Sequence, residues 1–354
     1  MRSHETPPWW RPDRFARRRA NLERRAALIR ATREFFTSRG FVEVETPALQ
    51  VSPGMEPHLV AFATDLIAPG AVEKRRLYLH TSPELAMKKL LVAGMPRIFQ
   101  LARVFRNAER AATHHPEFTM LEWYRANAGY ESLMQDCEEL LRAIAACGIE
   151  RLRWHGKECD PLAAAERITV AEAFARHAGI DILATAPDPR EPSLALLAAQ
   201  SEKIGIAPRP GDAWEDLFFR VSLERIEPKL GIGRATILYD YPISMAALSR
   251  AKPNDPRIAE RMELYVCGLE LANGFAELTD AAEQRRRFEA DMALKQRRYG
   301  ERYPIDEDFL AALAHGMPES AGIALGFDRL MMLACGADDI EDVLWAPVAP
   351  SGGA

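Results

Sequence analysis

The chain has 354 residues, of which 48% are hydrophobic and 27% are charged, and its formal net charge is -5 at pH 7. A chain of this length and apolar content can bury a full core as one large domain or two modest ones. The slightly acidic balance argues against a protein whose whole surface binds nucleic acid.

The cysteine pattern and the hydropathy pattern predict a cytoplasmic protein. The 5 cysteines are odd in number and include no CxxC pair, which is typical of reduced thiols rather than of a disulfide framework or a zinc site. No apolar run approaches the roughly 20 residues that a membrane-spanning helix requires. Residues 1–10 lack the apolar stretch of a signal peptide.

The chain opens with an expected irregular leader, residues 1–14, followed by a long helix. Apolar residues such as Leu22 and Phe36 recur at helical spacing, and Gly40 ends the pattern. The other face of the helix is either a solvated surface or a docking patch for an acidic partner. Its arginines are Arg14, Arg17, Arg18, Arg19, Arg24, Arg25, Arg30 and Arg33.

A strand and a second helix are predicted next. Residues 41–47 alternate apolar and polar side chains and stop at Pro47, as a strand does. In residues 81–92, Ser82 is placed to cap a helix whose first turn holds Pro83 and Glu84. An acidic residue in that turn also complements the helix dipole, so Glu84 has a structural explanation.

Residues 97–124 predict two strands joined by a polar loop. The loop holds Arg106, Glu109, Arg110, His114 and His115. Arginine and histidine at the neck and tip of a hairpin suit a polyphosphate, because guanidinium offers a rigid bidentate fork. The alternative is a charged surface hairpin without a ligand.

Residues 129–234 are predicted to be a mostly helical insertion. Helical spacing recurs at residues 131–146, 170–178, 193–204 and 214–230, and prolines separate these pieces. No residue pattern in this region points to chemistry.

A second polar constellation begins at Glu263. If a two-residue turn closes at Cys267 and Gly268, then Glu263 and Glu270 lie on one sheet face as diagonal neighbours, about 7–8 Å apart. Two such carboxylates repel unless a cation lies between them, and Mg²⁺ held by carboxylates and phosphates is the usual solution at an ATP site. Two solvated surface glutamates are the alternative.

Near the C-terminus, residues 320–333 predict a buried strand that runs into a helix at Gly326, before a tail at residues 348–354. Arg329 lies in the first turn of that helix. A cation is unfavourable there unless an anion or an aromatic ring accompanies it.

These segments together resemble the class II aminoacyl-tRNA synthetases, specifically their lysyl branch. Residues 103–124, with FRNAER and HHPEFTMLEWY, are similar to motif 2, and residues 21–47 and 320–333 are similar to motifs 1 and 3. TSPE at residues 81–84 and GLELANGFAELTD at residues 268–280 are similar to lysyl-branch segments. The resemblance covers nearly all of residues 15–347. It implies an α+β class II catalytic domain, a mainly antiparallel sheet flanked by helices, that dimerises around Pro47.

The resemblance also implies roles for the matching residues. Arg106 is the expected catalytic residue, since the motif 2 arginine holds the α-phosphate and the activated carboxylate, while Phe118 and Arg329 would cover the two faces of adenine. Glu263 and Glu270 would bind Mg²⁺. The ATP set would be Arg106, Asn107, Glu109, His114, His115, Phe118, Glu270, Leu271, Gly326 and Arg329. The set for a lysine-like substrate would be Ser82, Pro83, Glu84, Glu122, Tyr124, Asn273, Glu277 and Ala324.

Three positions depart from the lysyl pattern. Ala324 replaces a glycine, and its methyl group would reshape the wall beside the amino-acid pocket. Ala108 replaces a glutamate and His115 replaces an asparagine. None of these changes removes the arginines or the carboxylates, so we expect an active nucleotide site.

A larger departure concerns tRNA. Lysyl-tRNA synthetases carry an N-terminal anticodon-binding barrel of roughly 100–150 residues, and motif 1 begins too early here to leave room for it. The pattern is most similar to paralogues that activate β-lysine with ATP and transfer it to a lysine side chain of elongation factor P. We therefore expect ATP, Mg²⁺, β-lysine and elongation factor P as ligands and no stable tRNA binding. The alternatives are a truncated lysyl-tRNA synthetase acting on tRNA and an inactive module that senses lysine-like ligands.

Overall fold

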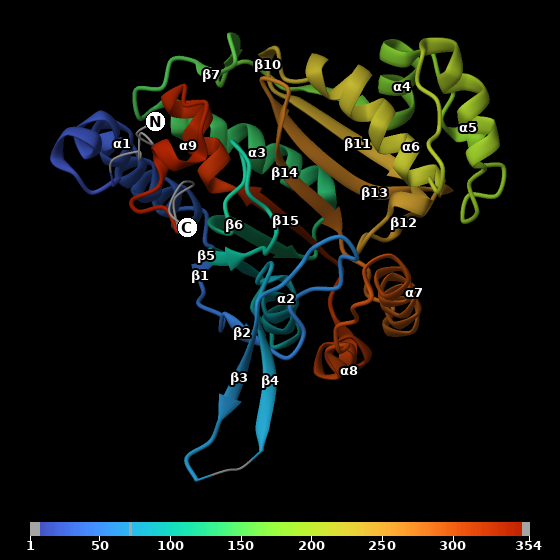
Figure 1. Ribbon diagram of the computed structural model, residues 1–354, viewed down its shortest axis with the longest axis horizontal. Coiled ribbons are helices and arrows are strands. Elements are labelled where there is room, and N and C mark those ends of the chain that lie inside the picture. The colour runs from blue at the N-terminus through green and yellow to red at the C-terminus, as the bar shows by residue number, and fades with distance from the viewer. Residues whose placement is uncertain (1–7, 71–72, 349–354) are drawn as a thin grey trace, which may run out of the picture.

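A computed structural model describes residues 8–70 and 73–348. Within these residues, nine strands form one large sheet in the order β1-β5-β6-β15-β14-β13-β11-β9, with β12 paired to β13 (Figure 1). The pairs β1–β5 and β9–β11 are parallel, and the other pairs of this sheet are antiparallel. In chain order the strands are β1 (Val42–Glu43), β5 (Arg97–Phe105), β6 (Glu117–Ala126), β9 (Glu166–Thr169), β11 (Thr236–Pro242), β12 (Ala251–Lys252), β13 (Asp255–Val266), β14 (Leu269–Ala276) and β15 (Ser320–Gly326).

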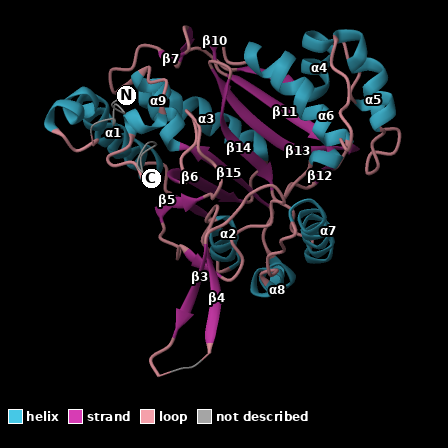
Figure 2. Cartoon of the chain, viewed as in Figure 1, coloured by secondary structure: helices cyan, strands magenta, loops and turns pink. Residues whose placement is uncertain are grey.

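Three groups of helices cover this sheet and form three cores (Figures 1 and 2). Helices α1 (Pro12–Thr37), α3 (Tyr130–Ala145) and α9 (Phe327–Cys335) pack in one core, against the middle strands. Helices α2 (Glu84–Val92), α7 (Ala281–Tyr299) and α8 (Glu307–Gly316) pack near β5 and β6. Helices α4 (Val170–Ala178), α5 (Leu194–Ser201) and α6 (Trp214–Val221) pack on β11 and β13. The predicted α+β architecture, a mainly antiparallel sheet flanked by helices, is confirmed.

Two smaller sheets and several short helical turns complete the described chain. One sheet has the order β10-β8-β7 and the other β2-β4-β3, and the hairpin of β3 and β4 projects from the body (Figure 1). These strands are β2 (Leu49–Gln50), β3 (Ala63–Ile67), β4 (Lys74–Leu79), β7 (Leu152–Trp154), β8 (Lys157–Asp160) and β10 (Gly233–Arg234). The turns are η1 (Leu183–Thr185), η2 (Glu202–Ile204), η3 (Ser222–Ile226), η4 (Glu227–Lys229), η5 (Ile243–Met245) and η6 (Ile340–Val343).

The predictions of helices and strands agree best with the structure where the periodic pattern of apolar residues is long. The helices expected in residues 129–234 are present, but the region also contains β7, β8, β9 and β10. Strands of two to four residues are too short for alternation to reveal them. For the same reason the strand predicted at residues 41–47 shrinks to Val42–Glu43. The predicted leader lies partly outside the described residues, and α1 already begins at Pro12.

The predicted turn at Cys267 and Gly268 is confirmed, with one change of register. Both residues have positive φ, 56° and 79°, as a two-residue turn that matches strand twist requires. Tyr265 pairs with Glu270 as predicted, but Leu264 pairs with Ala272, so the strand contains a bulge. Glu263 therefore lies opposite Asn273 rather than opposite Ala272.

The prediction that α1 exposes all of its arginines is wrong for two of them. Arg18 and Arg25 are 8% and 2% exposed. Arg18 donates from Nη1 to the carbonyl oxygens of Glu341 and Leu344, at 2.8 and 3.0 Å. Arg25 forms an ion pair with Asp328 of α9. These two arginines bind the C-terminal segment, so any docking patch has to be built from the others.

The described cysteines form no disulfide bonds, and Cys137, Cys159 and Cys267 are buried. Among the described residues, no helix has both the length and the apolar character to cross a membrane.

Candidate active site

One cavity of about 390 Å³ collects most of the residues that the sequence implicated. Its lining comes from β6, β14 and β15, from the starts of α2 and α9, from η6, and from the β2–β3 and β5–β6 loops. The predicted site residues that line it are Ser82, Glu84, Arg106, Glu109, His114, His115, Phe118, Glu270, Leu271, Asn273, Ala324, Gly326 and Arg329.

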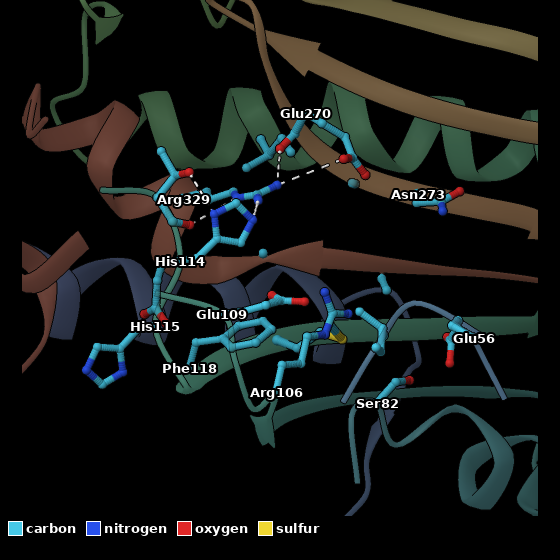
Figure 3. A pocket seen from close by; sticks show the side chains of 18 of the residues that line it. Glu56, Ser82, Arg106, Glu109, His114, His115, Phe118, Glu270, Asn273 and Arg329 are labelled. Atoms are coloured by element: carbon cyan, nitrogen blue, oxygen red, sulfur yellow. Dashed lines mark hydrogen bonds and ion pairs between the residues drawn. The ribbon is translucent and has the colours of Figure 1, made fainter. Parts of the chain in front are cut away.

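Arg106 and Phe118 form a pair at the end of the β5–β6 hairpin (Figure 3). The guanidinium carbon of Arg106 lies 5.2 Å from the ring centroid of Phe118. The Nε atom of Arg106 is buried and has no hydrogen-bond acceptor among the described residues. Because a buried N–H without an acceptor is costly, this geometry favours a bound anion, and guanidinium suits carboxylate and phosphate.

Arg329 reaches the cavity from the first turn of α9, directly after Gly326 (Figure 3). Its Nη1 donates to the carbonyl oxygen of Glu270 at 3.0 Å, and its Nη2 lies 2.8 Å from Nε2 of His114. Burial, followed by the positive charge of Arg329, lowers the pKa of His114, so a neutral imidazole accepts this hydrogen bond. The two interactions hold a cation where the helix dipole disfavours it, which suits a negatively charged ligand.

The opposite end of the site is acidic and is built on β6. The Oγ atom of Ser82 donates to one carboxylate oxygen of Glu122 at 2.5 Å, and the hydroxyl of Tyr124 donates to the other at 2.8 Å. Burial, followed by the negative charge of Glu84, raises the pKa of Glu122 to about 8. Glu122 therefore holds a proton near neutral pH, and a nearby cation would favour its release.

Lys88 neutralises two of the predicted substrate carboxylates, and the sequence analysis missed it. Its Nζ lies 2.5 Å from a carboxylate oxygen of Glu84 and 2.5 Å from one of Glu277. Burial lowers the pKa of Lys88, but Glu277 and Glu84 outweigh this and raise it above its ordinary value. Burial raises the pKa of Glu277 to about 7, although Lys88 opposes the rise. The spacing of Glu84 and Lys88, one helical turn, was an available signal for this pair.

Glu263 and Glu270 lie close together, and Glu263 already has partners. Burial and then the charge of Glu263 raise the pKa of Glu270, as expected for neighbouring carboxylates. Glu263 accepts hydrogen bonds from Arg261 Nη2 and from the Tyr265 hydroxyl, both at 2.7 Å. Arg261 also donates to the side chain of Asn273 at 3.3 Å. The alternation of Arg261, Glu263 and Tyr265 along β13 was the signal that the sequence analysis missed.

The structure places several predicted residues outside the cavity lining. Glu263 lines an adjoining cavity of about 360 Å³ that it shares with Glu270 and Asn273. Glu122, Tyr124 and Glu277 are buried behind the lining, and Pro83 is buried at the N-cap of α2.

Asn107 lies outside the cavity lining, and His115 borders the cavity with both of its ring nitrogens bound to backbone groups. Asn107 is exposed, and its side chain accepts a hydrogen bond from the backbone N–H of Ala108. His115 lies at the cavity edge, where its Nε2 accepts from the backbone N–H of Val348 at 3.1 Å (Figure 3). Hydrogen bonds with backbone groups thus occupy both side chains.

Ala324 lies in the wall of the cavity, between one acidic residue and one amide residue of the neighbouring strands. On β15 it pairs with Glu122 of β6 on one side and with Asn273 of β14 on the other. Ala324 lines the cavity and packs against a small apolar cluster that contains Met120. Its methyl group therefore lies where it affects the space available to a ligand.

An antiparallel sheet with a motif 2 arginine at a hairpin neck and a motif 3 arginine at a helix start defines a class II synthetase catalytic domain. The sequence profile of the family "tRNA synthetases class II (D, K and N)" matches residues 11–349, and the chain belongs to this family.

Curated relatives resemble this chain over almost their whole length. A protein of Sodalis glossinidius is 43% identical over 92% of this chain and 94% of its own. A protein of Pectobacterium carotovorum subsp. carotovorum is 42% identical over 95% and 96%. A protein of Klebsiella pneumoniae strain 342 is 42% identical over 92% and 94%. Each of these relatives is named elongation factor P–(R)-beta-lysine ligase.

Proposed function

We propose that the protein is an ATP-dependent ligase that activates (R)-β-lysine as an adenylate and transfers it to a lysine side chain of elongation factor P. The observation that carries this proposal is the polarity of one site. Arg329 stands at one end, and Arg106 lies between Arg329 and Ser82 (Figure 3). The carboxyl groups of Glu84, Glu122 and Glu277 gather at the end where Ser82 lies. Such a site suits a triphosphate beside an amino acid that carries amino groups. The name shared by the relatives supports the same reaction.

In the first step the carboxylate of β-lysine attacks the α-phosphate of ATP and pyrophosphate leaves. The unpartnered Nε of Arg106 supports a role in which this arginine donates to the carboxylate and to the phosphoryl oxygen. A fixed donor aimed at developing charge lowers the barrier without reorganisation. Phe118 and Arg329 are the proposed contacts to the adenine ring.

The donor set at β13 and β14 fits Mg²⁺ in a limited way. Glu263 and Glu270 are two close carboxylates, but Arg261 and Tyr265 each bind an oxygen of Glu263. No group of three or more histidines, cysteines or acidic residues suited to a metal occurs in the described residues. Two carboxylates with substrate phosphates are nevertheless a usual environment for Mg²⁺. We propose that Glu263 and Glu270 hold Mg²⁺ together with ATP, where the ion would neutralise phosphate charge.

In the second step the uncharged ε-amine of the acceptor lysine attacks the carbonyl carbon of the adenylate. The bond from that carbon to the AMP oxygen breaks, and the amine loses a proton. The reaction requires no covalent enzyme intermediate.

We also propose that residues 15–347 act as one catalytic domain, with residues 129–234 as its insertion, and that the protein is a homodimer. The exposed apolar residues Val42 and Leu49, which flank Pro47 in the sequence, support a dimer interface there.

Acceptor choice tests the proposal. The purified protein is incubated with ATP and labelled β-lysine or α-lysine, and elongation factor P and lysine tRNA are offered separately. Label on elongation factor P, with β-lysine preferred, is the expected result. Label on tRNA would instead indicate a tRNA synthetase, and no adenylate with either amino acid would indicate a binding module.

A further inference from the structure

The side chain of Glu56 lines the cavity, and the proposed reaction gives this carboxylate no role. It lies in the loop between β2 and β3 and lines the cavity with Ser82 and Glu84. Figure 3 shows Glu56 beside Ser82, at the end of the site away from Arg329 and His114. Its Oε2 atom is buried and has no hydrogen-bond donor among the described residues.

The loop around Glu56 is shaped to hold the carboxylate in this place. Gly54 has a φ of +139°, a conformation that residues with a side chain rarely adopt. A Cβ atom at Gly54 would lie 2.8 Å from Oε2 of Glu56 and 2.5 Å from Oγ1 of Thr81. The carboxylate therefore folds back over a position that only glycine leaves open.

Among the described residues, Glu56 has neither the cation that Glu84 and Glu277 share nor hydroxyl donors such as those of Glu122. Lys88 contacts both Glu84 and Glu277, and Glu122 accepts from Ser82 and Tyr124. Burial and then the charge of Glu84 raise the pKa of Glu56, while its own backbone N–H, Arg106 and Lys88 lower it. The Oε2 atom of Glu56 is nevertheless buried without a donor, which is costly, so a ligand with N–H groups would relieve this cost.

The lining of the cavity places Glu56 nearer than Glu277 to the reacting end of the substrate. Glu56 and Arg106 both line the cavity, whereas Glu277 is buried behind the lining. Lys88 and Glu84 act on both carboxylates, but Arg106 is among the charges that act on Glu56 and not among those that act on Glu277. Under the proposed function, Arg106 marks the position of the reacting carboxylate. The amino group near that carboxylate would therefore bind Glu56, and the amino group at the far end of the substrate would bind Glu122 and Glu277.

We propose that Glu56 is a specificity-determining residue that binds the amino group nearest the reacting carboxylate of a diamino acid. The proposal rests on the proposed function and deepens it by assigning the two amines of the substrate to different carboxylates.

Calorimetric binding in the presence of a non-hydrolysable ATP analogue tests this assignment. β-Lysine is compared with ε-aminocaproate, which keeps the carboxylate and the terminal amine but lacks the amine in question. Glu56→Gln should weaken binding of β-lysine about 10- to 100-fold, the range for a hydrogen bond to a charged group. Its affinity for ε-aminocaproate and for the ATP analogue should change less than about twofold, because neither ligand carries the group that Glu56 binds.

Asp291→Asn is the matched control. Asp291 is a half-buried carboxyl of α7 that lines a different cavity, and the charge of Glu56 raises its pKa after the effect of burial. Asp291→Asn therefore changes the electrostatics near Glu56 but leaves every carboxylate that lines the active-site cavity in place. The affinity for β-lysine should change less than about twofold.

The outcomes separate this proposal from the function on which it rests. Unchanged β-lysine affinity in Glu56→Gln, or an equal loss for both ligands, would overturn the role of Glu56 and leave the proposed function standing. Failure of the unaltered protein to bind either β-lysine or α-lysine would overturn the function and the role together.

Discussion

A buried ion pair between Arg25 and Asp328 joins α1 to α9, and replacing Arg25 by methionine tests its contribution to stability. Each side chain is 2% exposed. Arg25 also donates from Nη2 to Thr119 Oγ1 at 2.8 Å, and Asp328 accepts from the Thr119 backbone N–H at 2.7 Å. The three residues thus connect the first helix, the second strand of the hairpin and the helix that carries Arg329.

Methionine preserves most of the apolar stem but leaves Asp328 charged and with one donor fewer. Breaking a buried pair from one side typically costs about 3–5 kcal/mol. We expect a loss of that size in the free energy of unfolding of Arg25→Met. Urea unfolding followed by far-ultraviolet circular dichroism, at one fixed protein concentration, measures it.

Two variants control this experiment. Arg19→Met removes an arginine of the same helix whose pair with Glu23 is 71% and 63% exposed, so it should cost no more than about 0.5 kcal/mol. Arg25→Met combined with Asp328→Asn removes both charges and should cost less than Arg25→Met alone. The reasoning fails if Arg25→Met is no more destabilising than Arg19→Met, or if the second replacement brings no recovery.

Three further predictions concern the site. Arg106→Ala should reduce amino-acid-dependent pyrophosphate exchange about 100-fold or more, and exchange at the unaltered rate would remove Arg106 from catalysis. Ala324→Gly should raise the use of α-lysine relative to β-lysine in the same assay, and an unchanged ratio would remove the role of the methyl group. Burial raises the pKa of Glu122 to about 8, so this carboxyl loses its proton as the pH increases from about 6 to 8. The affinity for β-lysine, whose amino groups are cationic, should rise over the same range. In calorimetric titrations, Glu122→Gln should make that rise shallower and leave the part due to Glu277, whose pKa is about 7. An equally steep rise in Glu122→Gln would contradict the assignment to Glu122.

Local sequence signals predicted much of the fold and the main members of the site. Cys267 and Gly268, which both have positive φ, form the turn between β13 and β14. The pairing of Tyr265 with Glu270 follows because each residue lies two positions from this turn. A turn and the alternation next to it depend on neighbouring residues, so they are visible in the sequence. Arg106 and Arg329 each lie at a predicted junction between elements, but their proposed roles come from the resemblance to motifs 2 and 3.

Tertiary packing decided which charged residues pair across long sequence separations. Arg25 has the same chemistry as Arg19 six residues earlier, yet one is buried against Asp328 and the other is exposed. Lys88 meets Glu277 only because α2 packs beside the sheet that carries β14. Asn107 matches its motif but turns to the surface. Such outcomes depend on contacts between residues far apart in the chain, where the cost of burying a charge is settled by the partner that the fold supplies.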